Sequence, residues 1–297
     1  MQKTKESEAK KEEIFEATIM SNIKRKDAYI NHLQIVDGIP LFAWLDINPT
    51  ELCNRKCDFC PRGDGANYPN QNLNISLKLC QKINDELNAL NYQGAVVLSG
   101  YGEPMLHPEL VEMIRILGHN VHLEMVTNGD KITVDLAREM FANGLDMIVV
   151  SMYDGPHQVA YYEDIFAQAG ISPEQYTLRD RWYTIAEDYG VRLTNRGGVA
   201  TGGYQPEVDL YQPCHYPFYS MMLDWNGDVM LCVHDWNKKV KMGNIALDSM
   251  LDVWKSKNFD KYRVMLKKGK RILSPCSGCN TNGTLQGGVQ FEAWKDL

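Results

Sequence analysis

The stretch Cys53-Asn54-Arg55-Lys56-Cys57-Asp58-Phe59-Cys60-Pro61 directly follows an apolar run, residues 42–47, that has the pattern of a β-strand. It places three cysteines within eight residues, and thiolates at this spacing can bind one face of a metal cluster. No fourth cysteine or histidine follows nearby, so the loop cannot easily close a tetrahedral zinc site. Three structural thiols, or part of a zinc site, are the alternative interpretations. Three ligands on a four-iron cluster would leave one iron open for chemistry.

The segment after this loop alternates between apolar strand patterns and helical patterns. Together with residues 42–47, the expected strands are residues 95–98, 121–126, 147–150 and 191–194. The expected helices are residues 75–90, 107–117 and 134–143, and residues 157–190 are expected to be irregular and then helical. This order predicts an α/β fold with a parallel sheet, either open or curled into a partial (β/α) barrel. In such folds functional residues gather at the carboxyl ends of the strands.

Polar and glycine residues follow each of these strand ends. The second strand leads into Ser99-Gly100-Tyr101-Gly102-Glu103-Pro104, where glycines let the backbone approach a ligand and Glu103 can pair with an ammonium group. The later ends carry Thr127-Asn128-Gly129, then Ser151, then Thr194-Asn195-Arg196-Gly197-Gly198. An ordinary Asn-Gly turn and a surface arginine before a glycine-rich linker are the alternatives for Asn128 and Arg196.

A second group of four cysteines lies near the carboxyl terminus, at Cys214, Cys232, Cys276 and Cys279. Cys214 and Cys232 bracket an expected hairpin with an Asn-Gly turn at residues 226–227, and an expected helix at residues 251–266 leads back to the Cys-x2-Cys pair. Four cysteines make a complete site for either zinc or a 4Fe–4S cluster. The remaining cysteine, Cys80, lies on an apolar helical stripe and is expected to be a buried thiol.

Composition limits the class of protein. The chain has 297 residues with a net charge of −7, so it lacks the basic excess that nucleic-acid binding requires. It contains no apolar run of membrane-spanning length and no signal peptide pattern at its start. Eight cysteines without an export signal indicate metal chemistry in a reducing cytoplasm. We therefore expect a cytoplasmic protein with no nucleic-acid or membrane partner.

The cysteine loop resembles that of the radical S-adenosylmethionine (SAM) superfamily, Cys-x3-Cys-x2-Cys with an aromatic residue, here Phe59, before the last cysteine. The resemblance implies a 4Fe–4S cluster on Cys53, Cys57 and Cys60 whose open iron chelates SAM and splits it to a 5′-deoxyadenosyl radical. It further implies cofactor contacts from three later segments, namely Tyr101, Gly102 and Glu103 in the turn that holds the amine of SAM, Asn128 in a frequent Thr-Asn-Gly sequence, and Ser151 near the ribose or carboxylate.

The second cysteine group resembles the shortened SPASM, or twitch, domain, which implies one auxiliary 4Fe–4S cluster on Cys214, Cys232, Cys276 and Cys279. Residues 43–280, apart from the segment near 157–190, also resemble radical SAM dehydrogenases of the 2-deoxy-scyllo-inosamine type, which act on an aminocyclitol. In that family an arginine at the position of Arg196 lies near the reacting hydroxyl. The resulting division is an N-terminal helical extension at 1–40, a radical SAM partial barrel at 41–203 and a SPASM/twitch domain at 204–297.

The resemblance implies an oxidoreductase that converts a secondary alcohol of a sugar or aminocyclitol into a ketone. Arg196 or a neighbour would remove the hydroxyl proton, the auxiliary cluster would accept an electron, and a flavodoxin- or ferredoxin-type donor would reduce the first cluster. Two enzymatic alternatives are a sugar epimerase, which needs a thiol hydrogen donor and has only Cys80 to spare, and a peptide-modifying SPASM enzyme. The non-enzymatic alternative is a binding module stabilised by zinc or a cluster.

Overall fold

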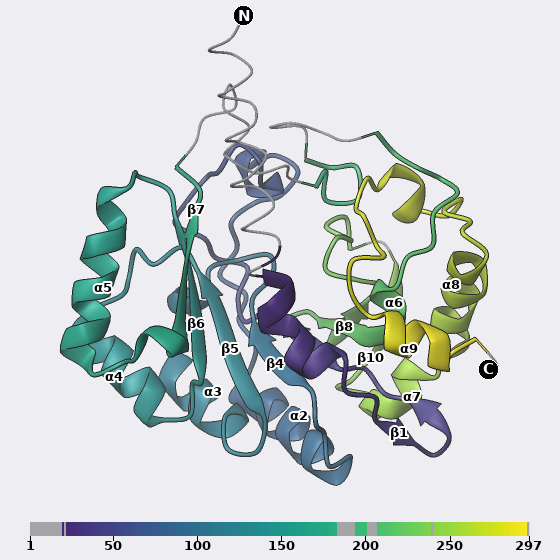
Figure 1. Cartoon of the computed structure of the whole chain (residues 1–297), viewed down its shortest axis with the longest axis horizontal. Coiled ribbons are helices and arrows are strands. Elements are labelled where there is room, and N and C mark those ends of the chain that lie inside the picture. Colours follow the sequence, from purple (N-terminus) through teal and green to yellow (C-terminus); the bar gives the residue numbers. More distant parts are fainter. Residues whose placement is uncertain (1–19, 21, 183–193, 201–206, 239, 296) are drawn as a thin grey trace, which may run out of the picture.

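The computed structural model describes residues 20, 22–182, 194–200, 207–238, 240–295 and 297. Among these residues an eight-stranded sheet runs in the order β10-β9-β8-β3-β4-β5-β6-β7 (Figure 1). Strands β3 to β7 are parallel neighbours, and β8 pairs in parallel with β3 on its other side. A parallel sheet with helices between successive strands is the predicted α/β architecture, and the prediction is confirmed. The bounds of the five strands are β3 Trp44–Ile47, β4 Ala95–Leu98, β5 His122–Thr127, β6 Met147–Met152 and β7 Tyr176–Asp180.

Four helices connect these strands, and several have a clear local reason to begin or end where they do. The hydroxyl of Ser76 caps the first by accepting a hydrogen bond from the backbone of Leu79, and Thr133 caps the third in the same way. The fourth ends at Gly170, which has a positive φ of 77°. The helices are α2 Leu77–Ala89, α3 Leu110–Leu117, α4 Val134–Ala142 and α5 His157–Ala169, with short 3₁₀ turns η1 Pro61–Gly63, η2 Pro104–Leu106 and η3 Pro173–Gln175.

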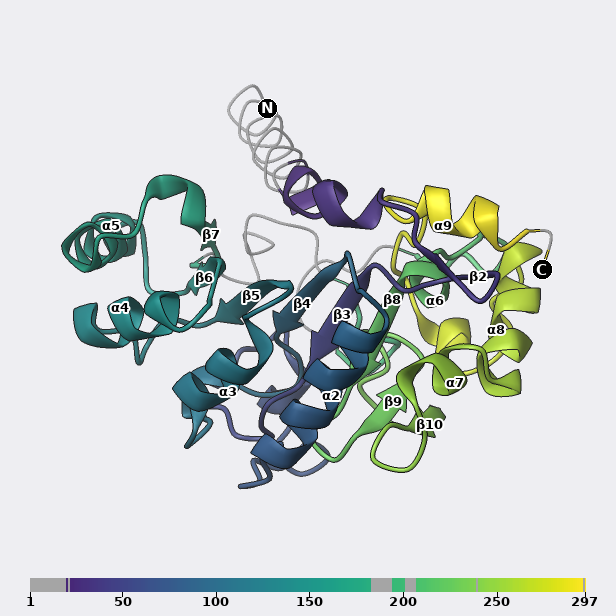
Figure 2. The ribbon, with the colours of Figure 1, turned by 90° about the horizontal axis from the view of Figure 1, so that it is seen from below.

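The sheet has two differently covered faces. Helices α2 and α3 lie on one side of the strands, and the N-terminal helix, residues 22–30, lies on the other (Figure 2). Ile30 of that helix is buried with Trp44, Ala95, Val97 and Tyr219 in a core cluster separate from the main one. Because alternate strand residues point to opposite faces, this cluster marks the side away from α2–α5. We call that side the inner face.

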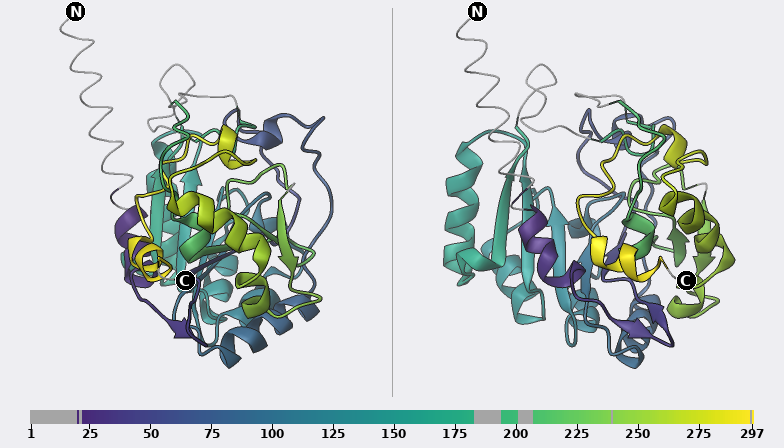
Figure 3. Two further views of the ribbon diagram at one scale, coloured as in Figure 1. Left: turned by 90° about the vertical axis from the view of Figure 1, so that its right-hand side faces the viewer. Right: turned by 45° about the vertical axis from the view of Figure 1, so that its right-hand side comes forward.

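The described part of the N-terminal extension therefore packs on the main domain. After the helix, a two-stranded hairpin of β1 Ile35–Val36 and β2 Ile39–Pro40 turns at Asp37 and Gly38, both with positive φ. Residues 1–19 lie outside the described part of the chain. The carboxyl-terminal helix α9, Gly288–Ala293, lies close to the N-terminal helix (Figure 3), and Gln290 of α9 donates to the carbonyl oxygen of Ile30.

The carboxyl-terminal part continues the same sheet across the predicted boundary at residues 203 and 204. The predicted hairpin is present as β8 Ser220–Leu223 and β9 Asp228–Met230, and β10 extends it on the far edge. The Cys-x2-Cys pair lies in a short 3₁₀ turn after the last long helix. The elements are α6 Tyr216–Tyr219, β10 Lys241–Asn244, α7 Met250–Trp254, α8 Lys257–Lys267 and η5 Cys276–Gly278.

Two sequence predictions are wrong in detail. Residues 157–182, the described part of the segment predicted to be irregular and then helical, instead begin with helix α5, which ends at Ala169, and continue into the parallel strand β7 at Tyr176–Asp180. Gly170 and Pro173 break the helix there, and the polar residues of β7 hid its alternation. The predicted strand at 191–194 lies outside the described residues except for Thr194. The predicted helix at 251–266 is two helices, because Ser256 caps a new helix at Lys257. No helix in the described ranges is long and apolar enough to cross a membrane.

Candidate active site

The three cysteines of the first loop are partly buried beyond the carboxyl end of β3. Arg55, between the first two of them, holds the loop against the next strand ends. Its guanidinium donates to Asp130 at 2.7 Å, after β5, and to Asp154 at 2.6 Å, after β6. The ring of Tyr153 lies 4.9 Å from the guanidinium carbon. Sequence reasoning missed these ion pairs, because their partners lie far apart along the chain.

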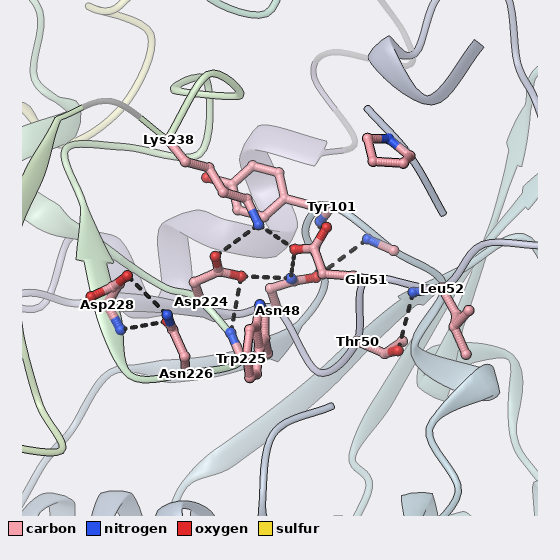
Figure 4. Close-up of polar contacts among 12 residues, drawn as sticks. Asn48, Thr50, Glu51, Leu52, Tyr101, Asp224, Trp225, Asn226, Asp228 and Lys238 are labelled. Carbon is pink, nitrogen blue, oxygen red and sulfur yellow. Dashed lines mark hydrogen bonds and ion pairs between the residues drawn. The ribbon is translucent and has the colours of Figure 1, made fainter. Parts of the chain in front are cut away.

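Arg62 fixes the other end of the loop from a buried position. Its Nε donates to the carbonyl oxygen of Tyr101 at 2.7 Å, and its Nη2 pairs with Glu51. Glu51 also pairs with Lys238, whose Nζ contacts Asp224 of the β8–β9 hairpin at 2.7 Å (Figure 4). This buried chain of charges therefore ties the cysteine loop to the carboxyl-terminal part of the sheet.

Glu103 lies in the turn after β4, and the residue is only 3% exposed. Three donors hold its carboxylate in place: the Thr127 hydroxyl at 2.6 Å, the Asn128 backbone N–H at 2.8 Å and the Met105 backbone N–H at 3.0 Å. Burial raises the pKa of Glu103 above its usual range, although these hydrogen bonds oppose that rise. A buried carboxylate with one acceptor position to spare is suited to a ligand ammonium group.

The two residues before Glu103 contribute backbone to this turn. Gly102 admits no side chain, because an added Cβ would lie 2.0 Å from the Thr50 carbonyl oxygen. The amide of Tyr101 donates to Asn48 Oδ1 at 3.0 Å. The Tyr101 ring is buried against Trp236, with ring centroids 4.8 Å apart. Cofactor contacts of Tyr101 and Gly102 stay a prediction, and the structure leaves Tyr101 only its backbone for them.

Asn128 and Ser151 lie at the next two strand ends. The Asn128 side chain donates to Asn54 of the cysteine loop at 2.8 Å, while its backbone N–H bonds to Glu103. The structure thus brings Asn128 together with the loop and the Glu103 turn. Ser151 is a buried residue within β6, and its hydroxyl accepts a hydrogen bond from Arg179 of β7 at 2.9 Å. Their roles toward a cofactor stay predictions.

The thiols of the first loop are close enough to affect one another. Burial is the largest cause of the raised pKa of Cys57, to about 12, and the charges of Cys60 and Cys53 raise it further. The pKa values of Cys53 and Cys60 are raised for the same leading reason. Because metal binding requires thiolates, loading iron here must release protons.

The second cysteine group surrounds one cavity. Its lining includes apolar side chains such as Leu231 and Leu266 and all four cysteines, Cys214, Cys232, Cys276 and Cys279. Arg271 positions the surrounding loops by donating to the carbonyl oxygens of Gln212, Pro213 and Thr281. Burial raises the pKa of Cys214 to about 11, and the Arg271 charge lowers it in part.

The donor set of this cavity favours a cluster over a single ion. In the described ranges, no three Cys, His, Asp or Glu side chains converge closely enough to hold one metal ion. Zinc needs its four ligands around a single point, whereas a cubane is held at its corners. The quartet therefore fits an iron–sulfur cluster. Gly283 leaves space for the Cys214 side chain, because an added Cβ would lie 2.5 Å from Cys214 Sγ.

Arg196 lies in a turn between the two cysteine sites. Its backbone has a positive φ of 50°. The neighbouring Asn195 fixes the turn by donating to the Gly278 carbonyl oxygen at 2.7 Å, within the Cys-x2-Cys pair. The Arg196 charge lowers the pKa of Cys60 in one site and that of His234 in the other. The Arg196 charge therefore acts on groups of both sites, and a catalytic role for Arg196 stays a prediction.

Sequence reasoning also missed polar residues on the inner face. His234 lines the cavity of the four cysteines, and its Nε2 is buried without a hydrogen-bond partner in the described part of the chain. Arg179 lies next to Ser151, and Lys26 reaches the face from the N-terminal helix. One sequence pattern could have revealed Arg179. Thr177, Arg179 and Arg181 alternate along β7 and just beyond it, which indicates a strand with one polar face, but this segment was not predicted to be a strand.

Two family models match the chain. Residues 47–177 match the radical SAM superfamily, and residues 214–280 match SPASM, the iron–sulfur cluster-binding domain. The chain therefore contains a radical SAM domain and a SPASM domain, and the cofactors that these two domains imply are SAM and two 4Fe–4S clusters.

Among curated proteins, the chain is similar to S-adenosyl-L-methionine-dependent 2-deoxy-scyllo-inosamine dehydrogenase from Niallia circulans, with 25% identity over 85% of this chain and 98% of that protein. It is also similar to a cofactor-modifying protein for tungsten-containing aldehyde ferredoxin oxidoreductase from Pyrococcus furiosus, with 26% identity over 37% of this chain and 30% of that protein. Among solved structures, BtrN in complex with AdoMet and 2-DOIA superposes with a TM-score of 0.70 and 23% identity, covering 84% of this chain and 97% of that chain. That likeness supports the fold.

Proposed function

We propose that the protein oxidises a secondary alcohol of a sugar or cyclitol to a ketone. The observation that carries the proposal is the second cysteine cavity, which four thiols line and which shares Tyr216 with a cavity beside the inner face. Oxidation of a carbinol removes one hydrogen atom, one proton and one electron. A second cluster near the substrate would provide an acceptor for that electron. The similarity to a dehydrogenase supports the same reaction.

The cofactors supply a 5′-deoxyadenosyl radical for hydrogen abstraction and a cluster for electron transfer. The part left to the protein is binding, orientation and exclusion of water. Cys53, Cys57 and Cys60 would hold the first cluster, and Cys214, Cys232, Cys276 and Cys279 the second. Glu103 would bind the SAM ammonium, with Tyr101, Gly102, Asn128 and Ser151 as further contacts.

Arg196 would act on the substrate hydroxyl as a hydrogen-bond donor. A guanidinium stays protonated in proteins, so it can hold the oxygen and stabilise negative charge that develops on it. The proton itself would then pass to a neighbouring acceptor or to water. This refines the sequence prediction, which allowed Arg196 to be the base. A flavodoxin- or ferredoxin-type electron donor and a cytoplasmic location remain part of the proposal.

Nothing in the described structure favours the epimerase. An epimerase must return a hydrogen atom to the substrate, commonly from a thiol, and seven of the eight cysteines belong to the two groups. The remaining thiol, Cys80, is 0% exposed in the main core beneath α2, on the side opposite the inner face. Burial raises its pKa to about 12. Cys80 is therefore badly placed to donate.

The product mass tests the proposal. With reconstituted protein, SAM, a reductant and a panel of neutral, amino- and acid-substituted sugars and cyclitols, we expect the accepted substrate to give a product two mass units lighter, in D₂O as in H₂O. Cys80→Ala should leave turnover nearly intact. A product of unchanged mass that gains one deuterium in D₂O, together with an inactive Cys80→Ala variant, would establish the epimerase instead.

A further inference from the structure

The inner face collects cationic side chains from two segments that are far apart in the sequence. Arg25 and Lys26 come from the N-terminal helix, whereas Arg179 lies in β7 and Arg181 directly follows that strand. Arg25 pairs with the fully buried Glu124 of β5. Lys26 Nζ lies 4.4 Å from the centroid of the Trp44 ring, which belongs to the inner-face cluster. The N-terminal helix therefore places two positive charges on the inner face of the sheet.

Strand register places the two later arginines on the same face. Val126 pairs directly with Val149, so these residues share a face, and Val126 packs on the inner-face cluster. Ser151 follows Val149 at the next alternate position and pairs directly with Arg179. Arg181 follows Arg179 in the same alternation.

The positive charges of these side chains also repel one another. The charge of Arg179 lowers the pKa of Lys26, and the charges of Arg181, Arg25 and Arg196 lower the pKa of Arg179. This repulsion agrees with the geometry, in which Lys26 lies over Trp44 and Arg179 lies beside Ser151 on the same face of the sheet. Four of these side chains therefore form one group, which we call the cationic cluster: Arg25, Lys26, Arg179 and Arg181.

The carboxylates around the cationic cluster do not neutralise it once the cofactor is added. Asp46 and Glu124 lie on the inner face, and Asp180, on the opposite side of β7, adds a third negative charge near Arg181. Four cations therefore meet three carboxylates in the described chain. SAM brings one carboxylate together with an ammonium and a sulfonium, so it adds positive charge. The positive charges that lower the pKa values of the cysteine thiols come from residues outside the cationic cluster, namely Arg55, Arg62, Arg196 and Arg271.

Several polar atoms here also lack partners. In the part of the chain that the structure describes, Arg179 Nε and Ser220 Oγ are buried without a hydrogen bond. Lys26 makes no hydrogen bond or ion pair with any described residue, and it lines a cavity together with Tyr216 and Tyr219. Buried donors without partners are costly, so a ligand that accepts their hydrogen bonds would be bound favourably.

We propose that the substrate carries an anionic group, a phosphate monoester or a carboxylate, which binds between Lys26 and Arg179 on the inner face. The inference rests on the proposed function, because it names the substrate class of the same site. It distinguishes this chain from an enzyme for an aminocyclitol, since an ammonium group would be repelled by the cationic cluster. The N-terminal helix then has a defined role as a supplier of substrate-binding charge.

Binding of three matched sugars tests the proposal. Glucose, glucose 6-phosphate and glucuronate share a ring and differ at carbon 6, and their affinities for the reconstituted full-length protein with SAM can be measured by calorimetry. We expect one of the two anions to bind at least about tenfold more tightly than glucose, as a charge-assisted contact provides. The stronger anion identifies phosphate or carboxylate as the preferred group.

Variants in the N-terminal helix give the matched controls. Lys26→Met should abolish the preference for the anion, Lys26→Arg should keep it, and Lys24→Met, at an exposed position of the same helix, should change nothing. Equal binding of all three sugars, or anion binding unaffected by Lys26→Met, would overturn the proposal. Anion binding that depends on Lys26 without ketone formation would uphold it and overturn the dehydrogenase function instead.

A pH profile adds a readout that a purely structural lysine would not move. Burial lowers the pKa of Lys26 to about 8, with Asp46 opposing and Arg25 and Arg179 adding to that shift. A lysine with a lowered pKa loses its charge as the pH rises past that value. Anion affinity should therefore fall above about pH 8 in the wild type. In Lys26→Arg it should persist there, because a guanidinium stays charged. The same fall in both proteins would contradict a role for Lys26.

Discussion

The two cysteine sites differ in how the chain encloses them. The first, at Cys53, Cys57 and Cys60, is a partly exposed loop held from outside by Arg55, Arg62 and neighbouring strand ends. The second lines a mainly apolar cavity with four thiols. Three cysteine ligands beside a buried carboxylate would leave one iron open to a small molecule, whereas four cysteine ligands would occupy every iron of the second cluster and leave it suited to electron transfer. The difference separates a site for chemistry from a site for electron transfer.

The largest expected effect comes from removing the first site alone. Replacing Cys53, Cys57 and Cys60 together by Ala should abolish SAM cleavage and leave about four of about eight irons per chain, because the second quartet is complete without the loop. Iron and sulfide analysis with a 5′-deoxyadenosine assay measures both. Loss of all iron from the triple variant would show that the two sites do not form independently.

Gly283→Ala makes the converse change. The new Cβ would meet Cys214 Sγ at 2.5 Å, so the second cavity should lose its cluster, about half of the iron. SAM cleavage without substrate should persist, while ketone formation should stop. Gly288→Ala is the control, because nothing lies within 4 Å of its added Cβ. Normal iron content in Gly283→Ala would mean that the cavity is not where the second cluster binds.

The smallest of the three effects tests the carboxylate that sets the first site apart. Glu103→Gln replaces a buried charge and should lower SAM affinity roughly tenfold, since losing a charge-assisted contact costs about 2 kcal/mol. Iron content should stay unchanged, because Glu103 is not a cysteine ligand. Equilibrium binding of SAM to the reconstituted protein measures the change. Unaltered affinity would remove Glu103 from the cofactor site and weaken the contrast between the two regions.

The sequence alone determined the features that depend on local spacing. Cysteines three or four positions apart must share a loop, so the first group and the Cys-x2-Cys pair were recognisable from their positions in the chain. Apolar runs separated by amphipathic segments predicted the parallel sheet, because a strand covered on both faces needs continuous hydrophobic residues. The Glu103 turn and Asn128 could be placed at strand ends for the same reason, and the structure brings them within 2.8 Å of each other.

Tertiary structure alone decided which charges face the inner sheet. Lys26 and Arg179 are far apart in the chain, and β7 was not recognisable because its inward residues are polar rather than apolar. The ion pairs of Arg55 with Asp130 and Asp154 could not be predicted from the sequence. They form only because successive parallel strands end at one edge of the sheet. The physical reason is that the sheet converts sequence-distant strand ends into neighbours. The cysteine sites could therefore be predicted from sequence spacing. The positions of Lys26 and Arg179 on the inner face depended on strand register and on where the N-terminal helix packs.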